Sequence, residues 1–81
     1  MTALELLAGA KTVGTKQTLK AVEDNTVAIV FIARDAEPRI IDPLRRLCAE
    51  KSVPITEVET MLELGKACRL MVGAAAAAVI K

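Results

Sequence analysis

The sequence predicts an α/β fold, a three-layer α/β/α sandwich built as one domain over residues 1–81. Segments with apolar residues at helical spacing alternate with short β-rich segments, which is typical of helices packed on both faces of a sheet. The run VAIVFIA, residues 27–33, is continuously apolar, as expected of a central strand covered on both faces. Because 53% of the 81 residues are hydrophobic, the chain can form the dense core that such a short domain needs.

Three elements are predicted before the central strand. Apolar residues at helical spacing over residues 3 to 8, with Gly9 as C-cap, predict a first helix. KTV at residues 11–13 predicts a very short strand. Residues 15–23 predict a second helix with Thr15 as N-cap, because a threonine hydroxyl can accept from an unpaired backbone N–H. Its core-facing side chains are expected to be Leu19 and Val22.

A third helix is expected after the loop RDAEP that follows the central strand. Since Pro43 would break a helix begun earlier, Asp42 is predicted as the N-cap and Pro43 as the first helical residue. Residues 38 to 42 then form only a preceding turn. SVPITEV, residues 52–58, predicts a short strand, and TMLE from Thr60 is a capping box that opens a helix to about Cys68.

The last segment, VGAAAAAVIK, has two interpretations. Alanine has high helix propensity and poor strand propensity, so propensity alone favours a helix. The alternative is a buried strand whose small side chains let helices pack closely, with Val72, Val79 and Ile80 at its ends.

Composition excludes several classes of protein. The net charge is +1, so any charge that attracts a polyanion must be local. A single aromatic residue, Phe31, disfavours RNA-binding modules that stack bases on aromatic platforms. Two isolated cysteines without histidine exclude the usual zinc patterns and Cys–His catalysis. Cys48 and Cys68 are therefore predicted to be buried thiols in a reducing cytosol.

No enzymatic signature is present in the sequence. Gly14-Thr15-Lys16 has no second glycine at the spacing of a phosphate-binding loop, and Glu57 and Glu59 are expected to be solvated rather than an acid/base pair. We therefore expect no catalytic residue, no metal and no cofactor. No run reaches roughly 18 apolar residues, and MTALELLAGAK lacks the basic start of a signal peptide, so no membrane partner and a cytoplasmic location are expected.

The stretch VGTKQTLK, residues 13–20, places Lys16 in the first turn of a helix, where the partial positive charge favours Asp or Glu. One interpretation is a capped helix with solvated lysines. The other is an anion site, in which first-turn N–H groups face a phosphate and Gln17 reads a base edge. RLMV, residues 69–72, is likewise either a loop that enters the last strand or an apolar lip that packs on a ligand.

The two motifs together resemble one family. GTKQTLK, followed about fifty residues later by LGKACRLMVGAAAAAVI, is similar to the large-subunit ribosomal protein family "L-seven-Ae/L-thirty-e", and most of all to its short bacterial members. The segments IARDAEP and PLRRLCAEKSVPI also fit the middle region of that family, including a proline inside its third helix. The resemblance implies a four-stranded mixed sheet with the alanine run as a strand. It also implies binding to RNA kink-turns, which are sharply bent duplexes with tandem sheared G·A pairs.

The resemblance implies roles for residues of the first motif and of the loop after residues 27–33. Gly14 would let the backbone approach the RNA, Thr15 would cap the helix, and Lys16 and Gln17 would read the edges of the G·A pairs. Lys20 would contact guanine or phosphate one turn further on. The following loop would contribute Asp35, which orients Lys20, and Arg34, which contacts the RNA backbone.

For the second motif, the resemblance implies that Leu70, Met71 and Val72 cover a flipped-out nucleotide, with phosphate contacts from Lys66 and Arg69. Arg69 stands where many members have glycine, so it is expected to take a different turn conformation, because only glycine adopts positive φ without cost. The predicted function is thus a monomeric, non-enzymatic protein that binds kink-turn RNA in the ribosome or in another ribonucleoprotein. The alternative is a protein–protein or ribosome-assembly adaptor on the same fold.

Overall fold

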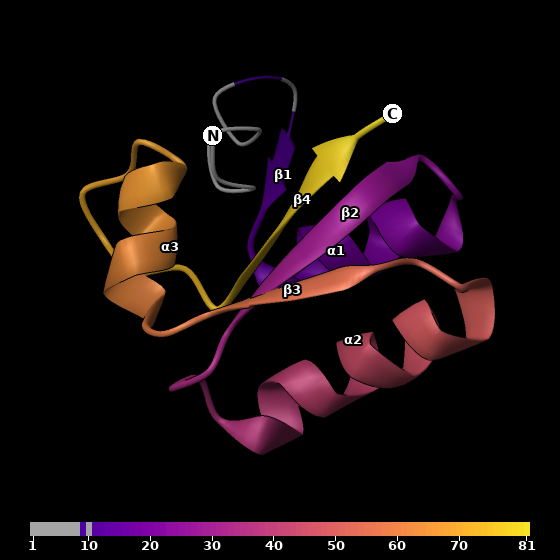
Figure 1. Ribbon diagram of the computed structural model, residues 1–81, viewed down its shortest axis with the longest axis horizontal. Helices are drawn as coiled ribbons and strands as arrows, with labels where there is room; N and C mark the ends of the chain where they lie inside the picture. Colours follow the sequence, from indigo (N-terminus) through magenta and orange to yellow (C-terminus); the bar gives the residue numbers. More distant parts are fainter. Residues whose placement is uncertain (1–8, 10) are drawn as a thin grey trace.

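The computed structural model describes residue 9 and residues 11–81; the helix predicted for residues 3 to 8 lies outside this part. The predicted fold class is confirmed: in the described part, three helices surround a four-stranded mixed sheet (Figure 1). In chain order the elements are β1 (Lys11–Val13), α1 (Thr15–Glu23), β2 (Val27–Ala33), α2 (Pro38–Lys51), β3 (Ile55–Val58), α3 (Met61–Ala67) and β4 (Ala76–Ile80).

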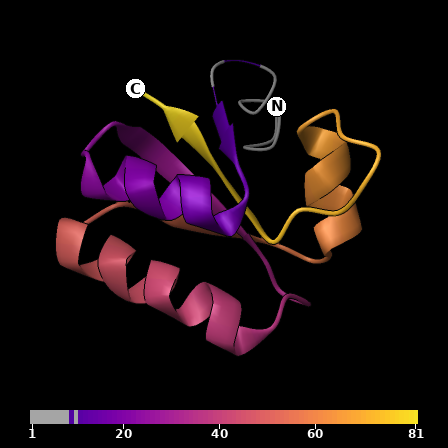
Figure 2. The same cartoon turned by 180° about the vertical axis from the view of Figure 1, so that it is seen from behind.

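The sheet has the strand order β1-β4-β2-β3. Strand β4 runs antiparallel to both β1 and β2, whereas β2 and β3 are parallel and are connected by α2, as a parallel pair requires. Helices α1 and α2 lie side by side on one face of the sheet, and α3 lies on the other (Figures 1 and 2). The three layers place β2 and β4 in the middle of the molecule.

The burial of β2 explains its sequence. Its second half, from Val30 to Ala33, is fully buried although successive side chains point to opposite faces. A strand covered on both faces needs apolar residues at every position rather than at alternate ones. The continuous run VAIVFIA therefore becomes a central strand, as predicted.

The alanine run forms strand β4, so the helix favoured by propensity alone is wrong and the strand implied by the resemblance is confirmed. Ala77 lies opposite Val13 of β1 and Phe31 of β2, and Ala76, Ala77 and Ala78 are completely buried. Two strands pair with β4, and their hydrogen bonds and packing outweigh the intrinsic preference of alanine. The small side chains leave room for bulky neighbours such as Phe31.

Helix α2 corrects a second prediction. It begins at Pro38 rather than at Pro43, so Asp42 is not its N-cap, and Pro43 lies inside the helix. Pro43 removes the hydrogen bond that residue 43 would donate to the Arg39 carbonyl. Both residues are exposed, so water can satisfy that carbonyl, while Ile41, Leu44 and Cys48 bury the opposite face. Burial of this face stabilises the helix across its proline.

The other predicted elements match the structure. Strand β1, strand β3 and helix α3 form where expected, and the Thr60 hydroxyl accepts from the Glu63 N–H at 3.0 Å, as a capping box requires. Cys48 and Cys68 are free, buried thiols, as predicted. Among the residues described, no helix has the length and apolar character needed to cross a membrane.

Candidate nucleic-acid interface

The segments that carry the predicted site residues meet at one end of the sheet. Strands β1 and β2 end there and β4 begins there, because β4 is antiparallel to both. Three backbone hydrogen bonds connect this end: Gly14 N–H to Ala76 C=O at 2.8 Å, Ala33 N–H to Ala75 C=O at 2.9 Å, and Arg34 N–H to Val58 C=O at 2.7 Å. The start of α1, the loop after β2 and the loop before β4 are therefore neighbours.

Helix α1 starts differently from the prediction. Its N-cap is Gly14, and Thr15 is the first helical residue, so the threonine hydroxyl does not cap the helix. Gly14 has φ 98° and ψ 149°, a conformation almost restricted to glycine, and its carbonyl accepts from the Thr18 N–H at 3.0 Å. The physical reason is the sharp turn from β1 into α1, which only a residue without Cβ makes without strain.

The first turn of α1 is open to an external acceptor. No side chain caps it and no acidic residue lies in it. The first N–H groups of an α-helix have no partner inside the helix and carry partial positive charge. We define the α1 tip as residues 14–17. It presents backbone donors together with the exposed side chains of Lys16 and Gln17.

Two threonines fix the rotation of α1 about its axis. Thr18 is completely buried, and its hydroxyl lies 3.3 Å from the Thr12 hydroxyl of β1, within hydrogen-bonding distance. Val22, four residues later, is also completely buried. With this face against the sheet, the lysines of the motif must face solvent.

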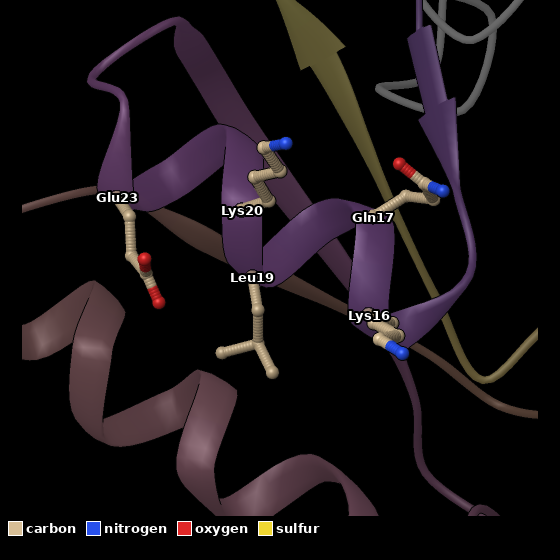
Figure 3. A pocket seen from close by; sticks show the side chains of 5 residues that line it. All are labelled: Lys16, Gln17, Leu19, Lys20 and Glu23. Atoms are coloured by element: carbon tan, nitrogen blue, oxygen red, sulfur yellow. The ribbon is translucent and has the colours of Figure 1, made fainter.

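Figure 3 shows how the exposed side chains of α1 diverge. Lys16 lies at the tip, and Leu19 points toward α2. Gln17 and Lys20 project to the side of β1, where both line a shallow hollow of about 260 Å³ with Thr12 and Thr26. Gln17 and Lys20, one helical turn apart, can therefore meet the same ligand surface.

A second feature at this end of the sheet is the apolar loop, defined as residues 70–73 between α3 and β4. Met71 is 99% exposed and Val72 67% exposed, and Leu70 is exposed as well. Three consecutive large apolar side chains at the surface are unusual for a loop, because such groups gain about 1.5–3 kcal/mol each on burial. The exposed loop is therefore a candidate contact surface.

The backbone of the apolar loop is held against α3. Leu70 N–H donates to Gly65 C=O and Ala74 N–H donates to Met61 C=O, both at 2.9 Å. A Cβ atom at Gly65 would lie only 2.0 Å from the Val72 carbonyl oxygen, so only glycine permits this close approach. The loop thus presents its side chains outward from a fixed backbone.

Arg69 corrects the expectation of an altered turn. It adopts φ 63°, the left-handed conformation that suits glycine, and its N–H donates to Lys66 C=O at 2.9 Å. The arginine therefore accepts the turn and its strain of about 1–2 kcal/mol. Lys66, in the last turn of α3, and Arg69 are both exposed and add two positive charges next to the apolar loop.

Asp35 has a different partner from the one implied by the resemblance. Its carboxylate Oδ1 accepts from the Met61 N–H at 2.8 Å, at the start of α3. Lys20 takes part in neither of the two salt bridges found among the described residues. The helix end explains this choice, since its partial positive charge attracts a carboxylate. Asp35 thus positions α3, while its neighbour Arg34 is exposed at the end of β2.

Met61 and Leu62 extend the apolar surface beyond the predicted residues, at 36% and 57% exposure. The spacing of apolar residues around Leu62 already indicates that its side chain is exposed. Leu64 of α3 and the C-cap residue Cys68 are spaced by four residues and are buried in the core, which leaves Leu62 on the outer face. An exposed leucine beside an exposed apolar loop indicates a larger contact surface than the motif RLMV alone.

The two buried cysteines are not activated as nucleophiles. Burial raises the pKa of the Cys48 thiol, and burial also raises that of Cys68, against a smaller opposing effect of Lys11. A thiol with a raised pKa is a poor nucleophile. In residues 9 and 11–81 no three His, Cys, Asp or Glu side chains cluster so as to hold a metal ion.

Fold and site define a small α/β/α binding module, with an open helix tip and an exposed apolar loop at one end of its sheet. The sequence matches the Ribosomal protein L7Ae/L30e/S12e/Gadd45 family over residues 4–81. The chain belongs to this family, in agreement with the resemblance carried by its two motifs.

The chain is similar in sequence to RNA-binding proteins and to a ribosomal protein. An RNA-binding protein of Geobacillus sp. (strain WCH70) is 47% identical over 76 residues, which are 94% of this chain and 93% of the relative. The large ribosomal subunit protein eL8 of Halobacterium salinarum is 48% identical over 68 residues, 83% of this chain and 57% of that protein. The family thus contains both separate RNA-binding proteins and ribosomal proteins.

A solved structure supports the same relationship. The 15.5kD RNA binding protein of Giardia lamblia superimposes with a TM-score of 0.89 at 31% identity, covering 96% of this chain and 70% of that one. The fold described here is therefore found in a relative whose name states RNA binding.

Proposed function

We propose that this protein is a non-enzymatic RNA-binding protein that recognises and stabilises kink-turns in ribosomal or other structured RNA. One observation carries the proposal: the open α1 tip and the exposed apolar loop lie at the same end of the sheet. The hydrogen bond from Gly14 N–H to Ala76 C=O joins the tip to the start of β4, the strand that follows the apolar loop. The RNA-binding and ribosomal names of the relatives support it.

The α1 tip suits a bent duplex rather than a straight one. The major groove of regular A-form RNA is too deep and narrow for side chains to read, but a sharp kink opens it to the end of a helix. In such a groove Lys16 supplies donors only, while the Gln17 amide both donates and accepts, so it can pair with a base edge. Gln17 then provides selectivity for the sheared pairs, and the backbone N–H groups provide anchoring.

The apolar loop suits a nucleotide that has left the stack. An extruded base exposes a large apolar face to water, and covering it offsets part of the free energy lost on unstacking. Met71 and Val72 are the most exposed large apolar side chains described, and they project from a backbone fixed against α3. The loop therefore favours the kinked form of the RNA.

The cationic side chains supply a local electrostatic contribution. Lys16 and Lys20 on α1, Arg34 after β2, and Lys66 and Arg69 before the apolar loop are all exposed. Phosphate contacts of this kind position an RNA-binding protein, whereas base contacts specify its target. A small footprint of a few phosphates is compatible with a net charge of only +1.

A second candidate function is a protein–protein or ribosome-assembly adaptor on the same fold. The exposure of Met61 and Leu62 favours it, because these side chains lie outside the two family motifs. We further propose that the protein acts as a monomer in the cytoplasm, where a reducing environment preserves its two free thiols.

The proposal is tested by titrating the protein against two RNAs. One contains a kink-turn, and the other is a copy whose G·A pairs are replaced by Watson–Crick pairs, measured at several salt concentrations. We expect tight binding to the first and only weak, salt-sensitive binding to the second. Equal weak binding to both would contradict kink-turn recognition and favour the adaptor function.

A further inference from the structure

The apolar loop takes its position from α3. The N–H of Leu70, the first residue of the loop, donates to the Gly65 carbonyl. The N–H of Ala74, which follows the loop directly, donates to the Met61 carbonyl. The carbonyl of Val72 sits in the space that a Cβ of Gly65 would occupy. Any shift of α3 relative to the rest of the molecule therefore moves the loop as well.

The position of α3 depends in turn on Asp35. The carboxylate of Asp35 accepts from the Met61 N–H at 2.8 Å. The backbone carbonyl of Met61 in turn accepts from the Ala74 N–H at 2.9 Å. Met61 thus joins Asp35 to the end of the apolar loop through two consecutive hydrogen bonds. Asp35 comes directly after Arg34, whose N–H donates to the Val58 carbonyl. It therefore lies at the end of the sheet where α1 begins.

A carboxylate at this end of the sheet is otherwise hard to account for. Phosphates would repel it, and no salt bridge of Asp35 is found in residues 9 and 11–81. Thr60 already caps α3 locally through the Glu63 N–H. The hydrogen bond from Met61 is non-local, spanning 26 residues, so it fixes where α3 lies rather than whether it is helical.

We propose that Asp35 is a positioning residue for RNA binding. Through its hydrogen bond to Met61 it fixes the position of the apolar loop relative to the α1 tip, so that the loop and the tip contact the same RNA. This inference rests on the proposed function and concerns the part of the site that covers the extruded nucleotide. Asp35 acts on RNA binding through the apolar loop and not through the lysines of α1.

The experiment compares Asp35→Ala with Asp35→Asn on two kink-turn RNAs. The second RNA carries an abasic residue at the extruded position, so it offers no base for the loop to cover. Asn keeps an oxygen acceptor for the Met61 N–H but removes the charge. Asp42→Ala is the matched control, since Asp42 is exposed and its side chain makes no hydrogen bond or salt bridge among the described residues.

We expect Asp35→Ala to bind the intact kink-turn about fivefold to tenfold more weakly, as for other residues of one hydrogen-bond network. On the abasic RNA its affinity should equal that of the wild type. Asp35→Asn and Asp42→Ala should bind both RNAs nearly as the wild type does. Amide hydrogen exchange at Ala74 should accelerate in Asp35→Ala and not in Asp42→Ala.

Equal losses on the intact and abasic RNAs would overturn the inference, as would wild-type affinity of Asp35→Ala for the intact RNA. If Asp35→Ala does not fold, Asp35→Glu replaces it, because it keeps the charge but displaces the acceptor by one methylene. The same base-dependent loss is expected, and a base-independent one contradicts the role. Failure of the wild type to prefer the kink-turn over its Watson–Crick copy would instead refute the proposed function.

Discussion

The N–H of Gly14 donates to the carbonyl of Ala76 across 2.8 Å, and this bond joins the start of α1 to the start of β4. The two motifs of the sequence lie about fifty residues apart, yet this bond places them in one structural unit. Strand β4 lies between β1 and β2 in the sheet, and its small alanine side chains leave room for the bulky residues of the neighbouring strands.

Gly14→Ala tests this junction. A Cβ at position 14 would meet no atom within 4 Å, so the penalty comes from the backbone conformation alone. We expect a loss of about 1–3 kcal/mol in the free energy of unfolding, measured by urea denaturation, because φ 98° with ψ 149° is nearly restricted to glycine. Stability within a few tenths of a kcal/mol of the wild type would show that the turn can change without cost.

Lys20→Ala tests the electrostatic contact on α1. Loss of one phosphate contact should weaken binding to all RNAs and reduce the slope of log affinity against log salt by about 1. Lys51→Ala is the control, since Lys51 ends α2 at the opposite end of the sheet and is likewise exposed. A slope unchanged in Lys20→Ala, or reduced equally in Lys51→Ala, would remove Lys20 from the interface.

Arg69→Gly should separate folding from binding. Relief of about 1–2 kcal/mol of left-handed strain is partly offset by the greater freedom of glycine in the unfolded chain, so we expect a net gain of up to about 1 kcal/mol. RNA affinity should fall at the same time through the loss of one cation. Asn25→Gly, at φ 58°, should gain less, because asparagine tolerates this conformation. A lower free energy of unfolding for Arg69→Gly than for the wild type would contradict the claim that Arg69 is strained.

The ion pair between Arg45 and Glu57 predicts a pH dependence of stability. The hydrogen bond and charge of Arg45, with a smaller effect of Arg34, lower the pKa of Glu57 in the folded state. A lowered folded-state pKa stabilises the fold above the unfolded value of about 4.3, and the effect disappears as the pH falls through the folded value. The Glu57 side chain is exposed, so the effect is small and screened by salt.

Urea midpoints of the wild type and of Arg45→Met should therefore differ at pH 7 and low salt, with the wild type more stable. They should converge once the pH falls below the folded-state pKa of Glu57, where its carboxyl group is protonated in both proteins. Arg46→Met, an exposed neighbour, provides the comparison for loss of positive charge alone. A difference that persists undiminished at low pH would assign the effect of Arg45 to packing instead.

Much of the fold could be predicted from local patterns. The apolar run of β2 and the capping box at Thr60 contain enough information within a few residues to define a strand and a helix start. The alanine run does not, because its strand state depends on pairing with β1 and β2 on either side. Pro43 was misleading for a similar reason: burial of Ile41 and Leu44 keeps helix α2 intact across a residue that usually ends one.

The candidate site was predictable in position but not in detail. The motifs indicated the α1 tip and the apolar loop, and the structure brings these segments to one end of the sheet. The role of Asp35 was not accessible, because its partner is the backbone of Met61, and a backbone N–H has no signature in the sequence. The same holds for Gly14, which caps α1 by its conformation and not by a side chain.

The central claim is that the α1 tip reads the sheared pairs of a kink-turn, and Lys16→Ala and Gln17→Ala test it most directly. The affinity of each variant is measured for the kink-turn RNA and for its Watson–Crick copy, beside Lys51→Ala. We predict a loss of roughly 1–3 kcal/mol on the kink-turn, little loss on the copy, and therefore reduced discrimination. Variants that bind both RNAs as the wild type does would contradict the claim.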